Sequence, residues 1–180
     1  MEDVNQAFSV WITGLPASGK STVAAALARS LRKLGIKVAV LESDALRKEF
    51  TGRHEYDELN REYFYASLAF IGRVLVEHGV SVIFDATANR RSYRDRARRQ
   101  IARFIEIFVD CPLEVCIQRD PKGIYRRAQE GRAANVPGLQ TVYEPPENPE
   151  IVIRGNQDDP EQAVGRILDV LTGKNFLAVP

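Results

Sequence analysis

The nine residues GLPASGKST at positions 14–22 constrain the fold of this chain more than any other segment. They follow the apolar run from Phe8 to Ile12 and fit the pattern G-x-x-x-x-G-K-[ST]. Glycines let such a loop curl until its backbone N–H groups converge on phosphate oxygens, and a helix that begins directly afterwards adds its positive end. The motif therefore predicts a strand, a phosphate-binding loop and a helix in direct succession.

Within this loop, Lys20 is expected to reach the β- and γ-phosphates of a nucleotide, and the Ser21 hydroxyl to bind Mg²⁺. The predicted nucleotide-binding residues are Gly14, Leu15, Pro16, Ala17, Ser18, Gly19, Lys20, Ser21 and Thr22. The motif alone does not separate switches, motors and kinases. A guanine-nucleotide switch would also carry an Asn-Lys-x-Asp motif, which the sequence lacks, and motor ATPases are generally larger.

Strand-like and helix-like segments alternate along the chain. Strands are expected at 8–13, 37–41, 80–84, 104–109 and 151–153, and helices at 20–34, 57–78, 91–102, 113–118 and 160–171. This alternation predicts an α/β fold with a mostly parallel sheet flanked by helices on both faces. We expect a single P-loop kinase domain over residues 1–180, because the sequence contains no internal repeat or linker.

Residues 120–150 interrupt this alternation and show little periodicity. They contain three glycines and five prolines, and a segment this long without regular structure inside a compact domain is usually functional. It suits the lid of a small kinase, because water competes for the γ-phosphate and must be excluded when the acceptor is bound. We therefore expect a lid near 120–150.

The composition limits the binding partners and the cellular compartment that we expect. Lys plus Arg (25) nearly balances Asp plus Glu (24), which argues against a general nucleic-acid coat protein. No apolar run approaches the roughly 20 residues of a membrane span, and the acidic start MEDVNQ does not resemble a secretory signal. The two cysteines, Cys111 and Cys116, are too few for a disulfide framework or a zinc cluster. We expect a cytoplasmic protein that acts on small molecules, without a membrane or nucleic-acid partner.

A carboxylate follows the second expected strand, in the run Glu42-Ser43-Asp44-Ala45-Leu46-Arg47. At that strand end Asp44 would face the γ-phosphate, where it could accept the proton of an attacking hydroxyl or hold a water of Mg²⁺. Arg47, one helical turn further on, could bind an anionic acceptor. The alternative is an Asp44 that caps a helix and an Arg47 that is solvated.

The third expected strand is followed by polar side chains as well. Strand ends in open α/β sheets point into the binding crevice, so Asp85, Thr87 and Asn89 are candidate acceptor contacts. Asp85 could instead cap the next helix. The arginines between 90 and 103 are expected to be mostly a solvated helix face, with one or two near the helix start turned toward the crevice.

The stretch RDPKGIYRRAQEGRAANVPGLQTVYEPPENPEI at 119–151 resembles the adenylylsulfate (APS) kinase family. That family shows R-D-x-K-G-L-Y, A-R-x-G, N-F-T-G-I-D and Y-E-x-P-x-x-P-E in the same order and spacing. Agreement extends to GLPASGKST, to Asp44 and Arg47 (the family's D-G-D-x-x-R) and to FIEIFVDCPLEVC at 104–116. The resemblance covers roughly residues 8–172.

The resemblance implies transfer of the ATP γ-phosphate to the 3′-hydroxyl of adenylylsulfate, with Mg²⁺ as cofactor. It also implies a homodimer, which is common in the family. Asp44 matches the proposed base, and Arg47 matches an arginine on the phosphosulfate of the acceptor. Arg119 and Lys122 match lid residues that serve the nucleotide and acceptor phosphates. The predicted catalytic residues are Lys20, Asp44, Arg119 and Lys122, and the predicted metal-binding residues are Ser21 and Asp44.

The departures from the family pattern concern the acceptor. The family stacks the acceptor adenine between two phenylalanines, and Val136 replaces the one in the lid, beside a retained Gly138. The other aromatic is expected at Tyr56, with Arg61 as the family's neighbouring arginine. The E-N-x-R-R element is missing near 63–67. An Asp-Ala-Thr after the third strand also resembles small kinases of the polynucleotide-kinase-like group.

Three hypotheses follow. The first is an ATP-dependent adenylylsulfate kinase whose acceptor is held differently from the family pattern, by Arg61 and Arg91. The second is a kinase for another hydroxyl acceptor, such as a sugar, polyol, nucleoside or polynucleotide 5′-end. The third is a nucleotide-binding module without transferase activity, which the retained Lys20 and Asp44 weigh against because a binder has little need of a base.

Overall fold

The computed structural model describes residues 7–51 and 58–178, with only the backbone of Thr51. Its sheet contains β1 (Ser9–Thr13), β2 (Val38–Glu42), β3 (Ser81–Asp85), β4 (Phe104–Asp110) and β5 (Ile151–Arg154) in the order β2-β3-β1-β4-β5. All four strand pairs are parallel. The expected α/β fold is confirmed, and each strand lies within a residue of its expected position.

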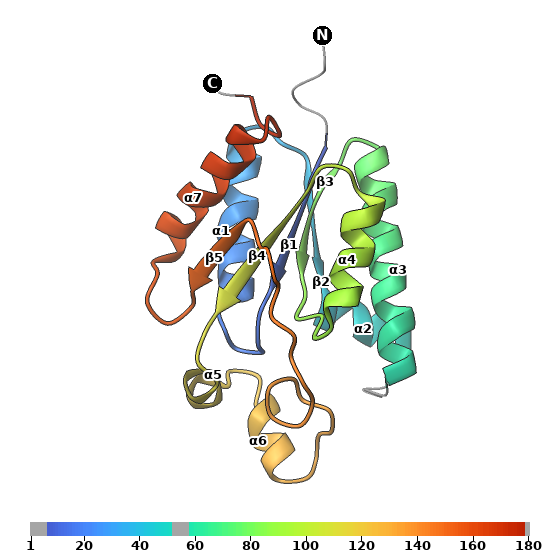
Figure 1. Ribbon diagram of the computed structural model, residues 1–180, viewed down its shortest axis with the longest axis vertical. Helices are drawn as coiled ribbons and strands as arrows, with labels where there is room; N and C mark the ends of the chain where they lie inside the picture. The colour runs from blue at the N-terminus through green and yellow to red at the C-terminus, as the bar shows by residue number, and fades with distance from the viewer. Residues whose placement is uncertain (1–6, 52–57, 179–180) are drawn as a thin grey trace.

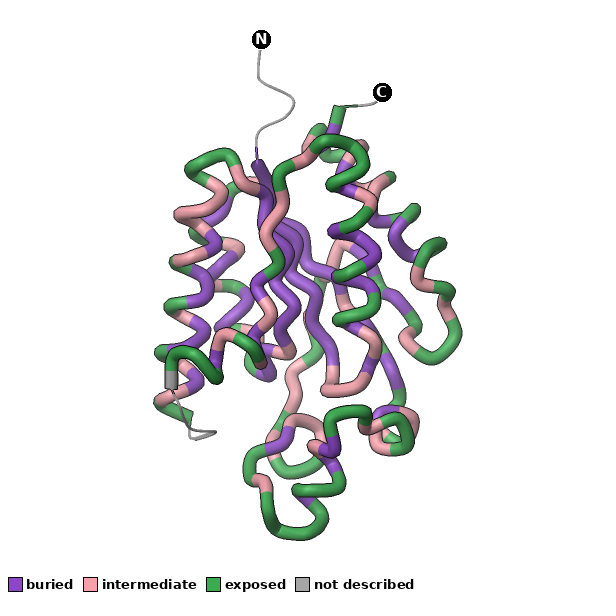
Figure 2. The backbone as a smooth tube through the Cα atoms, turned by 180° about the vertical axis from the view of Figure 1, so that it is seen from behind, coloured by how far each residue is buried: buried purple, intermediate pink, exposed green. Residues whose placement is uncertain are grey.

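Helices cover both faces of the sheet (Figure 1). On one face lie α1 (Lys20–Lys33) and α7 (Pro160–Gly173), and on the other lie α3 (Glu58–Glu77) and α4 (Arg91–Gln100). Every residue of β1 is buried, as expected for a central strand covered on both sides. The buried strands run between helices whose outer faces are exposed (Figure 2).

Alternate side chains of β1 supply two separate apolar cores. Val10 and Ile12 pack with residues of α1 and α7, among them Leu27 and Ile167. Trp11 points to the opposite face and stacks on Phe84, with ring centroids 4.5 Å apart. Because both faces are filled, β1 is fixed in the middle of the sheet, and the loop that follows it begins at a rigid point.

Three short helices lie at the carboxyl ends of the strands: α2 (Ser43–Thr51), α5 (Leu113–Arg119) and α6 (Ile124–Gln129). Residues 113–150, which we call the lid lobe, project beyond this edge of the sheet (Figure 1). The lobe has its own apolar cluster, which includes Cys116, Tyr125 and Val136. Two of these helices, α2 and α6, were not expected from the sequence, and the six residues of α6 are too few to show a helical period.

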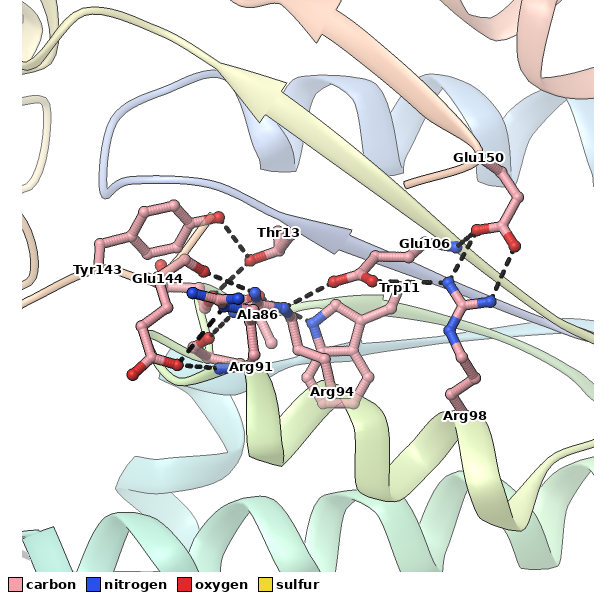
Figure 3. Close-up of polar contacts among 12 residues, drawn as sticks. Trp11, Thr13, Ala86, Arg91, Arg94, Arg98, Glu106, Tyr143, Glu144 and Glu150 are labelled. Atoms are coloured by element: carbon pink, nitrogen blue, oxygen red, sulfur yellow. Dashed lines mark hydrogen bonds and ion pairs between the residues drawn. The ribbon is translucent and has the colours of Figure 1, made fainter. Parts of the chain in front are cut away.

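The segment that returns from the lid lobe to β5 is fastened to the sheet by buried and partly buried polar contacts (Figure 3). Arg94 donates through Nε to Glu106 at 2.6 Å and through Nη2 to the carbonyl of Glu144 at 2.6 Å. Glu150 accepts two hydrogen bonds from Arg98, at 2.8 and 2.9 Å, and one from the Glu106 N–H at 2.6 Å. The lid lobe therefore leaves the sheet through α5 and rejoins it at a rigid anchor.

Candidate active site

A cavity of about 570 Å³ opens at the carboxyl edge of the sheet, lined by the phosphate loop, the ends of β2 and β3, and the lid lobe. This is the edge at which open α/β sheets bind ligands. The predicted site residues that line it are Pro16, Ala17, Gly19, Lys20, Ser21, Thr22, Asp44, Asp85, Thr87, Arg119 and Lys122. The cavity thus combines the predicted donor residues, a carboxylate from each of two strand ends and two lid cations.

The first glycine of the phosphate loop lies too close to β4 for any side chain to fit. A Cβ on Gly14, whose φ is 153°, would lie 2.4 Å from the carbonyl oxygen of Val109 on β4. Gly19 has a φ of 109° and immediately precedes α1, so the helix begins at Lys20 with its free N–H groups facing the loop. This is the arrangement that binds phosphate oxygens at a helix N-terminus.

Lys20 is the only lysine that the structure describes as buried, with 8% of its surface exposed. Its Nζ donates a hydrogen bond to the carbonyl oxygen of Leu15, at 2.7 Å. Burial lowers the pKa of the Lys20 ammonium, and the negative charges of Asp85 and Asp44 partly oppose this. The loop therefore holds a partly desolvated cation beside the place where phosphates would bind.

Asp85 ends β3, is 6% exposed and accepts a hydrogen bond from the Ser21 hydroxyl. Burial raises the pKa of this carboxyl, while the Ser21 hydrogen bond and the Lys20 charge act in the opposite direction. The interpretation of Asp85 as a helix cap is wrong: α4 has Arg90 at its N-cap position, with no side-chain capping bond. Asp85 instead belongs to the cavity floor beside the loop.

Asp44 lies in the first turn of α2, on the other side of the cavity. The lid residue Lys122 reaches across and places its Nζ 2.8 Å from Asp44 Oδ2 and 3.3 Å from Glu42 Oε1. Burial alone would lower the pKa of Lys122, but its hydrogen bonds and its attraction to Asp44 and Glu42 outweigh that effect and raise it. The lid cation and the expected base are therefore in direct contact.

Arg119 borders the cavity on the side of β5. Its Nη1 donates to the carbonyl oxygen of Gly155, at 2.9 Å. Residues 155–158 and Pro160, between β5 and the start of α7, also line the cavity and were not expected from the sequence. The only feature of the sequence that could have placed them at the cavity is their position after a parallel strand, because the carboxyl ends of all such strands meet at one edge of the sheet.

The other predicted site residues do not line this cavity: Gly14, Leu15, Ser18, Arg47, Arg61, Asn89, Val136 and Gly138. Arg47 is 5% exposed and lies over the ring of Phe64, 4.0 Å from its centroid, so the interpretation of Arg47 as a solvated residue is wrong. Tyr56, the expected acceptor aromatic, falls outside the described residues.

Arg61 and Asn89 connect the lid lobe to the rest of the molecule. Arg61 donates to the Asn89 side chain at 3.3 Å and to the carbonyl oxygen of Asn135 in the lobe. Asn89 in turn donates to the carbonyl of Val142, at 3.0 Å. Val136 is 4% exposed and packs inside the apolar cluster of the lobe.

Gly138 touches the phosphate loop, where an added Cβ would lie 2.6 Å from Leu15 Cδ2. Its φ of 85° also favours glycine. The retained glycine of the lid motif thus lets the lid lobe approach the loop closely.

The comparisons with known proteins agree with this geometry. A family model described as Adenylylsulphate kinase matches residues 6–154. The chain belongs to the adenylylsulfate kinase family. An adenylyl-sulfate kinase of Synechococcus sp. (strain JA-2-3B'a(2-13)) is 36% identical over 169 residues, which are 94% of this chain and 97% of the relative. A probable adenylyl-sulfate kinase of Pyrococcus abyssi is 36% identical over 157 residues, covering 87% and 90%.

Solved structures of the family superpose on most of the chain. The APS kinase CysC of Mycobacterium tuberculosis, in complex with AMPPNP and APS, is 30% identical, with a TM-score of 0.87 and coverage of 93% of this chain and 98% of that one. A sugar kinase from Janibacter sp. is 24% identical with a TM-score of 0.65, which shows a shared fold alone. Among the described residues, no helix is long and apolar enough to cross a membrane.

Proposed function

We propose that this member of the adenylylsulfate kinase family transfers the γ-phosphate of ATP to the 3′-hydroxyl of adenylylsulfate, giving 3′-phosphoadenylylsulfate. The observation that carries the proposal is the convergence of Lys20, Asp44 and Lys122 on one cavity at the carboxyl edge of the sheet. A related kinase of the same fold was crystallised with an ATP analogue and APS together, which supports the same pair of substrates here.

On the donor side, the backbone of the loop and Lys20 bind the phosphates, and Lys20 exchanges its Leu15 carbonyl for phosphate oxygens. The exposed Ser21 hydroxyl and the buried Asp85 carboxylate offer hard oxygen atoms next to the loop, so the residues present fit Mg²⁺. Ser21 supplies the hydroxyl ligand. When bound, Mg²⁺ neutralises charge on the β- and γ-phosphate oxygens.

On the acceptor side, Asp44 accepts the proton of the attacking hydroxyl. Its carboxylate is available for this role once Lys122 moves from Asp44 toward the transferring phosphate, where the charge of the ammonium stabilises the transition state. Arg119 binds the nucleotide from the lid side of the cavity. The lid lobe excludes water while the two substrates are aligned.

A kinase for another alcohol is the second candidate, and the lid lobe supplies the observation that favours it. Val136 occupies the family's aromatic position but packs inside the lobe, and Arg61 is engaged with Asn89 and Asn135. An acceptor adenine would then lack the stacking partner that the lid provides elsewhere in the family, a loss of roughly 1–3 kcal/mol. A smaller acceptor would not need that partner.

A coupled assay of ADP release distinguishes the two candidates. The purified chain is given ATP and Mg²⁺ with adenylylsulfate, or with a panel of sugars, polyols, nucleosides and a 5′-hydroxyl oligonucleotide. The matched control is Asp44→Asn, which keeps the shape of the side chain and removes the base. Turnover with adenylylsulfate that Asp44→Asn abolishes supports the proposal; turnover with a panel alcohol alone assigns the second candidate.

We also propose a single domain, a cytoplasmic location and a homodimer. The dimer is supported by exposed apolar side chains on α3, where Leu59, Tyr63 and Phe70 are 64%, 65% and 54% exposed. A related APS kinase from Thiobacillus denitrificans is hexameric, and this chain spans 31% of its length. Light scattering on the purified chain measures the mass directly, and a monomer at micromolar concentration would contradict the dimer.

A further inference from the structure

Two carboxylates reach the cavity from neighbouring strands, and their surroundings differ. Asp85 is the last residue of β3, which pairs directly with β1 and therefore with the strand that carries the phosphate loop. Asp44 follows β2, which is one strand further from β1. The order of the strands thus places Asp85 next to the loop and Asp44 beyond it.

We infer that Asp85, together with Ser21, forms the protein's part of the Mg²⁺ site and that Asp44 is not a metal ligand. The inference rests on the proposed function, because it concerns the cation that accompanies ATP. None of the family motifs that this sequence matches includes Asp85, so the assignment comes from the geometry of the cavity.

The contacts of Asp85 carry the first step. A carboxylate that is 6% exposed is costly to bury unless it has polar partners. Its partners here are the Ser21 hydroxyl and the charge of Lys20, both from the phosphate loop. Mg²⁺ in nucleotide sites is usually held by one or two protein oxygens and the substrate phosphates. The Ser21–Asp85 pair presents such oxygens where the phosphates of a nucleotide in the loop would lie.

The contacts of Asp44 carry the second step. Its side chain is 46% exposed and faces the lid rather than the loop. Lys122 already places an ammonium between Asp44 and Glu42, at 2.8 and 3.3 Å. A divalent cation there would compete with that ammonium and would lie one strand further from the phosphate loop than a cation at Asp85. The two carboxylates therefore have separate roles: Asp85 binds the metal, and Asp44 remains for the acceptor hydroxyl.

Binding of Mn²⁺ in the presence of ADP, followed by electron paramagnetic resonance, tests this assignment without any acceptor. For Asp85→Asn we expect the affinity for Mn²⁺ to fall at least about tenfold, while affinity for ADP without metal changes by less than about threefold. For Asp44→Asn, the matched control, we expect Mn²⁺ affinity within about twofold of the unchanged protein, because Asp44 is not a ligand.

Wild-type Mn²⁺ affinity in Asp85→Asn, or a comparable loss in Asp44→Asn, would overturn the inference. Asp85→Ser, a smaller neutral side chain, is measured in parallel so that a folding defect of one variant does not decide the result. As a second readout, the extra thermal stabilisation that Mg²⁺ gives to the ADP complex should disappear in both Asp85 variants and persist in Asp44→Asn. Since no acceptor is present, failure of the adenylylsulfate assay leaves this outcome unaffected.

Discussion

Lys20 shows how a single buried charge prepares the loop for a polyphosphate. Its ammonium is 8% exposed, donates to one backbone carbonyl and has a pKa lowered by burial. A phosphate group offers it a fully charged partner in place of the Leu15 carbonyl. With phosphate, the attraction between opposite charges is added to the hydrogen bond that the ammonium already donates. We therefore expect Lys20 to contribute more interaction energy when a nucleotide is bound than in the free protein.

Replacement of Lys20 by methionine keeps the length of the side chain and removes the charge. We expect ATP affinity to fall about tenfold or more and γ-phosphate transfer to fall further, because the ammonium also stabilises charge in the transition state. Calorimetry and initial rates measure the two effects separately. The matched control is Lys33→Met, an exposed lysine in the last turn of α1, which should leave both unchanged. Normal kinetics in Lys20→Met would refute the assignment of the loop.

At the scale of elements, α4 is more than the solvated helix that its arginines indicated. Arg90 and Arg99 are exposed, but Arg94 is buried in the contact with Glu106 that anchors the return segment of the lid lobe. Arg98 and Arg91 form ion pairs with that segment as well. Most of the arginines keep solvent contact, as expected, and three of them, Arg91, Arg94 and Arg98, also fasten the returning segment of the lid lobe to the sheet.

Arg94→Met tests how much this anchor contributes. It leaves Glu106 buried, with Arg98 at 3.5 Å as its remaining charged neighbour, so we expect a loss of about 3 kcal/mol in the free energy of unfolding. Urea denaturation measures it. The control is Arg29→Met, which breaks an exposed pair with Glu161 and should cost less than about 1 kcal/mol. Equal losses in the two variants would show that burial of the Arg94 pair adds nothing.

Periodicity predicted all the elements of the central sheet, because buried strands and amphipathic helices leave a clear pattern over five or more residues. Within the lid lobe it predicted α5 but missed α6 and the contacts that fix the lobe, for two physical reasons. The helix α6 is shorter than two turns, and the contacts that fix the lobe join residues far apart in sequence, such as Arg61 with Asn135. The role of Lys20 could be predicted from the local motif alone. The contact between Ser21 and Asp85 could not be predicted without the order of the strands in the sheet.

At the scale of the whole molecule, the lid lobe contacts the body of the protein at separate places, among them Glu150 and Lys122. Its anchor at Glu150 joins it to the sheet, and the contact of Lys122 with Asp44 lies at the cavity. Because the anchor at Glu150 contains an ion pair, its contribution to the stability of the molecule depends on pH.

Glu150→Gln tests how the anchor at Glu150 contributes to stability at low pH. Burial alone would raise the pKa of Glu150, but hydrogen bonds from Arg98 and the Glu106 N–H outweigh it and hold the pKa below the ordinary value of 4.5. A carboxyl whose pKa is lower in the folded state contributes stability that is fully present above its unfolded pKa and is lost as pH falls through the folded value. We therefore expect the free energy of unfolding to fall more steeply below about pH 4.5 in the unchanged protein than in Glu150→Gln.

Urea denaturation from pH 7 to pH 3 measures this difference. The control is Glu77→Gln, which removes an exposed pair with Arg73 and should keep the steep slope. Parallel curves for Glu150→Gln and the unchanged protein would assign the acid sensitivity to other carboxyl groups.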